Sequence, residues 1–265
     1  MTAISTADTE PRVRKANPDA RYKYYTLAIF LVILCLWEAL PRLGLVNEIL
    51  LPRFSAVAVA FWTLVQQPFF YGHLGVTLSE ILIGFVCGVT LGLSLGIMLA
   101  VSKAARAVTY PFVVAFQATP KVVFAPLFVA WFGFGITSKI VMAIVISFFP
   151  VLINTLAGLE SVPESARMLM RSIRASRFQT FFKVSLPHAL PIIFAGIKAA
   201  LVFSVIGAIV GEFIGASQGL GYLLNLYNYQ LRIDRVFAVI VVLASIGAGG
   251  FFLLEWLDKK LIFWR

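Results

Sequence analysis

Six long apolar stretches, separated by shorter polar segments, constrain the fold of this 265-residue chain more than any other feature. A transmembrane α-helix needs about 20 predominantly apolar residues. We therefore predict an all-α membrane protein with six transmembrane helices. The expected spans are residues 24–43, 76–101, 109–132, 138–159, 188–215 and 236–257.

The amino-acid composition excludes a soluble domain. Hydrophobic residues make up 60% of the chain and charged residues 13%, whereas soluble domains have about 45–50% and about 25%. Residues 1–23 are polar and should form a disordered arm before a single transmembrane domain, residues 24–265. Cys35 and Cys87 lie in apolar runs, so we predict neither a disulfide framework nor a redox site.

The distribution of Lys and Arg residues predicts the orientation in the membrane. With the amino terminus inside, the inner segments carry three times as many basic residues as the outer ones, as the positive-inside rule requires. Both termini should therefore be cytoplasmic, and the net charge of +10 requires no nucleic acid partner. The basic residues of the outer segments are Arg42, Arg53, Lys139, Arg232 and Arg235.

The second span has a glycine at every fourth position, and residues at this spacing share one face of a helix. Glycine costs about 1 kcal/mol relative to alanine inside a helix, so we predict that another helix packs closely against this face. The alternative is a chance pattern in a membrane helix that tolerates glycine. The four residues are Gly84, Gly88, Gly92 and Gly96.

Two ionisable residues inside apolar stretches are candidates for a translocation path. Lys121 follows Pro120 in a span that prolines interrupt, where freed carbonyl groups require protein or water around them. Glu212 lies in the fifth span, and a carboxylate in hydrocarbon is costly unless it is paired or hydrated. Glu212 could instead lie among the headgroups at the outer end of its span, and both interpretations stay open.

The polar segment 160–187 predicts a helical hairpin on the inner membrane face. Ser161 and Glu164 have the spacing of a capping box. An apolar face follows, and basic residues occupy the opposite face; a second short helix should cover residues 178–184. This hairpin is either an interfacial element held by anionic lipid or a docking element for a cytoplasmic protein. The apolar face consists of Ala166, Leu169, Met170 and Ile173, and the basic face of Arg167, Arg171 and Arg174.

The sequence predicts no catalytic, metal or nucleotide site. It contains no Gly-x-x-x-x-Gly-Lys-Ser/Thr motif that would hold ATP phosphates. His73 and His188 have no nucleophile or metal-ligating partner at a recognised spacing. We therefore expect a protein that is not an enzyme and binds no cofactor.

The stretch from Glu164 to Pro191 resembles the cytoplasmic loop of binding-protein-dependent ABC importer permeases. The pattern of that loop is Glu-Ala-Ala, three residues, Gly, nine residues, Ile, one residue and Leu-Pro. Leu186-Pro187 matches, and Val184 stands at the Ile position. The sequence departs from the pattern at the triplet, where Met168-Leu169-Met170 stands, and at the glycine, where Arg174 would require a right-handed backbone or strain.

Further motifs resemble the nitrate, sulfonate and taurine branch of this family, which also contains permeases for pyrimidine vitamin precursors. The resemblance covers residues 24–265 and implies the type I importer permease fold. The motifs are Leu51-Pro52-Arg53-Phe54-Ser55, Thr119-Pro120-Lys121, Ala125-Pro126-Leu127, Trp131-Phe132-Gly133-Phe134-Gly135, Gly211-Glu212-Phe213 and Gly219-Leu220-Gly221.

The resemblance also implies function and partners. It implies a permease subunit in the bacterial inner membrane, a homodimer, two copies of an ATPase subunit that hold ATP and Mg²⁺, and an external solute-binding protein. A secondary transporter and an intramembrane enzyme are the alternatives, and the solute stays open. The residues expected to contact the ATPase are Glu164, Ala166, Leu169, Met170, Ile173, Arg174, Ala175, Leu186 and Pro187.

Overall fold

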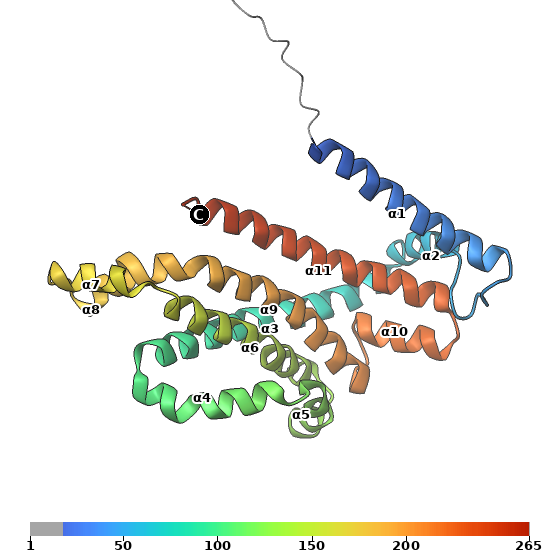
Figure 1. The fold of residues 1–265 in the computed structure, drawn as a ribbon. Coiled ribbons are helices and arrows are strands. Elements are labelled where there is room, and N and C mark those ends of the chain that lie inside the picture. The colour runs from blue at the N-terminus through green and yellow to red at the C-terminus, as the bar shows by residue number, and fades with distance from the viewer. Residues whose placement is uncertain (1–17, 265) are drawn as a thin grey trace, which may run out of the picture. The chain divides into compact units, whose positions relative to one another are not determined.

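The structure is a computed structural model that describes residues 18–264 and is all-helical in that range (Figure 1). The chain divides into two compact units, with the boundary after Ser55. Residues 1–17 of the expected disordered arm lie outside the described residues. Residues 18–23 belong to the first helix, so the prediction of disorder is wrong for them.

The first unit holds helix α1, Pro18–Arg42, and the segment that returns from it. Most apolar side chains of α1 are exposed in this chain, as expected for a span that faces lipid or another protein. Two contacts hold the returning segment. The indole of Trp37 donates to the carbonyl of Pro52 at 2.9 Å, and the carboxylate of Glu38 accepts from both the amide and the hydroxyl of Ser55.

The second unit contains the remaining helices, with α2 starting at the boundary. Its long helices α3, α6 and α9 pack against one another, and α6 makes close contact with both of the others (Figure 1). The elements are α2 Phe54–Val65, α3 Pro68–Val101, α4 Lys103–Ala118, the 3-10 turn η1 Lys121–Phe124, α5 Ala125–Phe132, α6 Ile136–Glu160, α7 Glu164–Ser172, α8 Arg177–Thr180, the π-turn η2 Phe181–Ser185, α9 Leu186–Gly215, α10 Leu220–Tyr229 and α11 Ile233–Leu261.

The glycine-bearing face of α3 packs against α6 along its whole length. A Cβ atom added at Gly92 would lie 2.7 Å from the Cβ of Val151 and 2.8 Å from the carbonyl oxygen of Phe148. Small residues of this kind allow two membrane helices to approach backbone to backbone. The residues of α6 that face the four glycines are also spaced by four, and they are Ala143, Ser147, Val151 and Thr155.

Hydroxyl groups supplement this packing. Ser204 of α9 donates to the carbonyl of Ile81 in α3 at 2.7 Å, and Ser147 of α6 lies against the backbone of Gly84. On the other side of α6, a Cβ atom at Gly207 of α9 would lie 2.6 Å from the Cα of Ala143. The core of the second unit is therefore a set of three helices held at the distance that glycine permits.

The hydropathy pattern located the spans well except for the third. Among the described residues, five helices are long and apolar enough to cross a membrane, or six if a bent pair counts as one span. The bent pair is α4 with the segment Lys121–Phe132, and its two halves meet at 90°. The bent pair corresponds to the expected span 109–132, and the interruption predicted from its prolines is confirmed: the chain turns at Pro120, which supplies no backbone donor, and α4 begins earlier than expected, at Lys103.

Candidate functional site

The break between α4 and η1 opens a small cavity lined by three polar side chains. The cavity has a volume of about 250 Å³ and lies between α4, η1, α6 and α9. Gln117, Lys121 and Asn154 supply its polar groups, and Phe149 and Phe203 are among its apolar walls. Its position beside a broken helix fits the rule that irregular backbone at membrane depth lines a cavity or is covered by protein.

The ammonium group of Lys121 is held at this cavity by the local structure. Its Nζ donates to the carbonyl oxygen of Gln117 at 3.2 Å, one turn back in α4. It also lies 4.7 Å from the centroid of the Phe149 ring, within the range of a cation–π interaction. Neither contact neutralises the charge, so Lys121 presents a cation to the cavity.

Glu212 is placed differently from the sequence-based expectation. Its side chain is 1% exposed and is enclosed by α3, α9 and α10 of this chain, so it is not open to a path. Thr77 donates to one carboxylate oxygen at 2.6 Å, and the amide of Gly221 donates to the other. Glu212 does lie near the end of its span, three residues before the last residue of α9.

The carboxylate of Glu212 belongs to a set of side chains that cap the amino terminus of α10. The first amides of a helix have no partner within it. Here the Gly219 amide donates to Nδ1 of His73 at 3.0 Å, and the Leu220 amide donates to the Thr77 hydroxyl at 2.8 Å. Glu212 accepts from the next amide, so three side chains from two other helices fix the start of α10.

Lys139 completes this buried cluster from α6. Lys139 was counted among the basic residues of the outer segments, but it is 1% exposed, lies within α6 and faces the end of α9. Its Nζ donates to the carbonyls of Phe134 at 2.6 Å and Gly215 at 2.8 Å. A lysine at the last carbonyls of a helix also complements the helix dipole. Lys139 therefore fixes the turn that leads from α9 to α10.

The helical hairpin lies at the opposite end of the second unit, but its start differs from the prediction. Helix α7 begins at Glu164 with Pro163 as the N-cap residue, and no side chain caps it. The hydroxyl of Ser161 instead donates back to the carbonyl of Gly158. The predicted capping box is therefore wrong. The capping box of this segment lies at α8, where Ser176 and Gln179 bond reciprocally.

The bend of the hairpin keeps its geometry although arginine stands at the glycine position. Arg174 has φ +56°, the left-handed conformation that glycine usually occupies. Its amide donates to the carbonyl of Arg171 at 3.0 Å, and the amide of Ala175 donates to the carbonyl of Met170 at 2.9 Å. These two bonds form a Schellman motif with Arg174 at its left-handed residue. The sequence left two possibilities for Arg174, a right-handed backbone or strain. Its positive φ shows that the backbone is left-handed and therefore strained.

We expect Arg174→Gly to stabilise this end of α7 by about 1 kcal/mol, because glycine adopts the left-handed conformation without steric cost. Hydrogen–deuterium exchange of the α7 amides should become slower in the variant. The matched control Ser172→Gly places glycine in the last helical residue, and exchange there should become faster. Unchanged or faster exchange in Arg174→Gly would contradict a strained bend.

The exposed surface of the hairpin is partly the predicted one. Leu169 and Ile173 are 64% and 65% exposed and lie beside the exposed Met168. Met170 is only 8% exposed and faces this chain, so it is not available as an anchor for a partner. Of the remaining residues expected to contact the ATPase, Glu164 pairs with Arg171 at 3.4 Å. Ala166 and Ala175 are half-buried. Leu186 and Pro187 lie in the first turn of α9.

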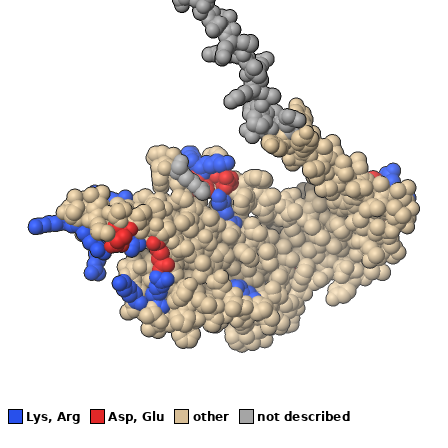
Figure 2. Space-filling view, viewed as in Figure 1, with Lys and Arg blue, Asp and Glu red and all other residues tan. Residues whose placement is uncertain are grey.

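The second arm of the hairpin runs without interruption into the membrane. Helix α8 continues through the π-turn η2 into α9, so the helix expected over residues 178–184 is present and, as expected, runs into Leu186 and Pro187. Leu186 and Pro187 therefore lie within one continuous helix, Arg177–Gly215, that leads from the hairpin into the core. Figure 2 shows charged side chains gathered over the end of the molecule that α7 and α8 form.

The sequence analysis missed several residues of the cavity beside Lys121 and of the buried cluster around Glu212. Nothing in the local pattern of Thr77 or Lys139 indicates that these residues meet Glu212 or the end of α9. Gln117 could have been found, because it lies four residues before Lys121 and therefore on the same side of a helix. Asn154 is the polar residue of α6 that shares the cavity with them.

Comparison with known proteins gives a consistent family match. The family model described as "binding-protein-dependent transport system inner membrane component" matches residues 88–263. A probable ABC transporter permease protein of Haemophilus influenzae is 36% identical over 236 residues, which cover 89% of this chain and 96% of that protein. The formylaminopyrimidine transport permease protein ThiX of Halalkalibacterium halodurans is 34% identical over 89% of this chain and 94% of its own.

A putative aliphatic sulfonates transport permease protein, SsuC of Bacillus subtilis, is 32% identical over 96% of this chain and 92% of its own length. Among solved structures, an inward-facing form of the MetNI methionine ABC transporter matches with a TM-score of 0.61. This match has 22% identity and covers 73% of this chain and 94% of that chain. The fold predicted from the sequence is confirmed by this likeness.

Proposed function

Because this chain belongs to the family of inner-membrane components of binding-protein-dependent transport systems, it is a permease subunit of an ABC importer, and we propose that its solute passes beside Lys121. The observation that carries the proposal is the cavity at the broken span. There a lysine and two amides line a small space in an otherwise apolar region. A translocation path needs such groups, since they replace part of the solute's hydration.

A second copy of the chain would complete this path. The turn at Thr119 and Pro120 leaves irregular backbone and exposed apolar side chains, such as Val123, on the surface of this chain. At membrane depth such backbone must be covered by protein or must line a water-filled space. A symmetric homodimer with the path between its copies satisfies both conditions.

The remaining partners follow from the family and from the two ends of the molecule. The hairpin of α7 and α8 faces the cytoplasm and receives an ATPase dimer, which holds ATP and Mg²⁺. The opposite end, with α10, receives the external solute-binding protein. In this arrangement both termini are cytoplasmic, and the permease itself hydrolyses no nucleotide.

The positive charge of Lys121 favours a small anion as the solute. Permeases for sulfonate, nitrate and taurine are among the relatives, as are those for formylaminopyrimidine and riboflavin. A cavity of about 250 Å³ suits a solute of a few heavy atoms. The ammonium group of Lys121 attracts an anionic solute more strongly than it attracts a neutral one, because two opposite charges interact directly.

Uptake measurements on the assembled importer test the role of Lys121. We expect Lys121→Gln to lower uptake of the anionic solute by about tenfold, because about 1.4 kcal/mol of favourable electrostatic interaction is lost. Lys121→Arg should retain most of the uptake. The panel should include taurine, nitrate, an alkanesulfonate and riboflavin.

The matched control is Lys103→Gln, which removes a charge from an exposed position at the start of α4, away from the cavity. It should leave uptake unchanged. Equal uptake in Lys121→Gln and the wild type, with both complexes intact, would refute a path beside Lys121.

A further inference from the structure

A large cavity lies at the cytoplasmic end of this chain, between the hairpin and the ends of α3 and α6. Its volume is about 770 Å³. Val101 is the last residue of α3 and Leu159 is the penultimate residue of α6. The mouth of the cavity therefore lies where two spanning helices end, which in the proposed orientation is the headgroup level of the inner leaflet.

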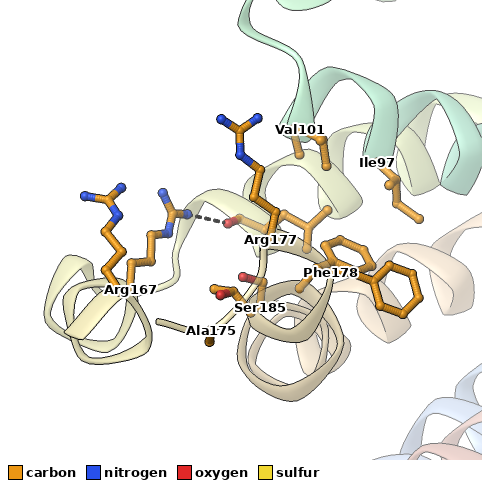
Figure 3. A pocket seen from close by; sticks show the side chains of 12 residues that line it. Ile97, Val101, Arg167, Ala175, Arg177, Phe178 and Ser185 are labelled. Atoms are coloured by element: carbon orange, nitrogen blue, oxygen red, sulfur yellow. Dashed lines mark hydrogen bonds between the residues drawn. The ribbon is translucent and has the colours of Figure 1, made fainter. Parts of the chain in front are cut away.

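One part of the cavity is strongly basic. Arg167, Arg171 and Arg177 line it, together with the hydroxyl-bearing Thr180 and Ser185. None of the twelve described residues that line it is acidic. Figure 3 shows the side chains of Arg167 and Arg177 extending toward the same side.

The three guanidinium groups differ in how they are engaged within the chain. Arg167 donates to the carbonyl of Leu159 at 3.0 Å, which leaves its charge unneutralised. Arg171 lies 3.4 Å from the exposed carboxylate of Glu164. Within the described part of the chain, Arg177 has no acidic side chain at ion-pair distance. The basic part is therefore available to an external anion.

The other part of the cavity is apolar. In Figure 3, Ile97, Val101 and Phe178 lie on the side of the cavity away from Arg167, and Arg177 lies between the two groups. Val101 is 68% exposed and Phe178 is 72% exposed, so both offer apolar surface that the described residues 18–264 leave uncovered. A ligand for this site should carry an anionic group and an apolar group next to each other.

We propose that this cavity binds an anionic phospholipid of the inner leaflet, with its phosphate against the three arginines and its first acyl methylenes against Ile97, Val101 and Phe178. The forked donors of arginine match phosphate oxygens, and basic pockets between membrane helices bind such headgroups. A free phosphate ion would fill only a small part of 770 Å³ and would leave the apolar wall uncovered. The lipid would connect the hairpin to the ends of α3 and α6. The proposal rests on the cytoplasmic orientation of the hairpin but not on the path beside Lys121.

Lipid retention by the purified full-length complex tests this site. The complex is exchanged into neutral detergent and supplied with phosphatidylglycerol, with phosphatidylcholine of the same chains, with glycerophosphoglycerol that lacks chains, or with inorganic phosphate. Native mass spectrometry then counts bound molecules, and a melting curve records stabilisation. Phosphatidylglycerol alone should be retained and should raise the melting temperature.

The double variant Arg171→Gln with Arg177→Gln should lose at least about tenfold in affinity for phosphatidylglycerol, since two charge-assisted contacts are removed. Both side chains are exposed, so the fold should persist, and the lipid-free melting temperature checks this. The matched control is Lys103→Gln with Lys183→Gln, which removes the same charge from exposed positions outside the cavity. It should retain the lipid.

Four results would overturn the proposal. They are no retention by the wild type, equal loss in both double variants, equal binding of chain-free headgroup or phosphate, and loss of ATPase co-purification in the arginine variant with lipid retention unchanged. The last would assign the cavity to the ATPase. None of these measurements requires solute uptake, so failure here and failure of the path beside Lys121 are distinguishable.

Discussion

Gly92→Leu is expected to prevent formation of the three-helix core. Even a single Cβ atom at this position would lie 2.8 Å from the carbonyl oxygen of Phe148 and 2.7 Å from the Cβ of Val151. Neither atom can move without its backbone, so α3 and α6 must separate. Overpacking a well-packed core costs about 1–3 kcal/mol and occasionally more, and we expect the upper end of this range or beyond.

Size-exclusion chromatography and a thermal melt in detergent measure this effect. Gly92→Leu should give little monodisperse protein, and Gly88→Leu should behave in the same way because Ser147 occupies the corresponding space. Gly75→Leu is the matched control, since Gly75 lies in the same helix and, apart from its chain neighbours and the backbone of its own helix, no described atom lies within 4 Å of its added Cβ. A normal elution profile and melting temperature in Gly92→Leu would disprove the close contact.

Leu169→Asp is expected to release the ATPase from an otherwise intact permease. The leucine is 64% exposed, and together with Ile173 and Met168 it forms an uncovered apolar surface on the hairpin. Burying a leucine side chain in a partner's groove contributes about 1.5–3 kcal/mol. Its loss therefore corresponds to about tenfold or more in affinity, and burying an unpaired carboxylate adds to the cost.

Co-purification of the ATPase with tagged permease provides the measurement, and Leu169→Met provides the control because it keeps an apolar side chain of similar volume. The control should retain the ATPase. Met170→Asp is not a useful substitute, because Met170 is buried in this chain and its loss should disturb the hairpin itself. Full ATPase recovery with Leu169→Asp would show that this surface does not hold the partner.

The sequence predicted the fold where the physics is local. Hydropathy alone located five of the spans, because the length of a membrane helix follows from bilayer thickness, although α1 and α3 begin six and eight residues before the expected starts. The fourfold spacing of glycines showed which face of the second span meets another helix. It did not identify α6 as the partner, because the small residues there, such as Ala143 and Ser147, are separated by larger ones.

The surroundings of the candidate site residues were less predictable than the spans, and the reason differs between residues. Lys121 was selected as a candidate because it follows a proline, which is a local signal, and the structure places it at a cavity. Glu212 was identified as an ionisable residue at membrane depth, but its position depends on Thr77, which is 135 residues away in the sequence. Periodicity placed Met170 with Leu169 on one face, but the face is broad enough that one side chain packs inward and the other stays exposed.

By itself, the sequence determined where the chain crosses the membrane, where the third span breaks and that a basic hairpin follows the fourth span. These features depend on runs of apolar residues, on prolines and on charge, all of which act over a few neighbouring residues. Only the tertiary structure decided that Glu212 and Lys139 fix the turn between α9 and α10, and that Arg174 occupies a left-handed bend. Such outcomes depend on which distant segments meet, because buried donors and charges must find partners and only packing brings those partners within reach.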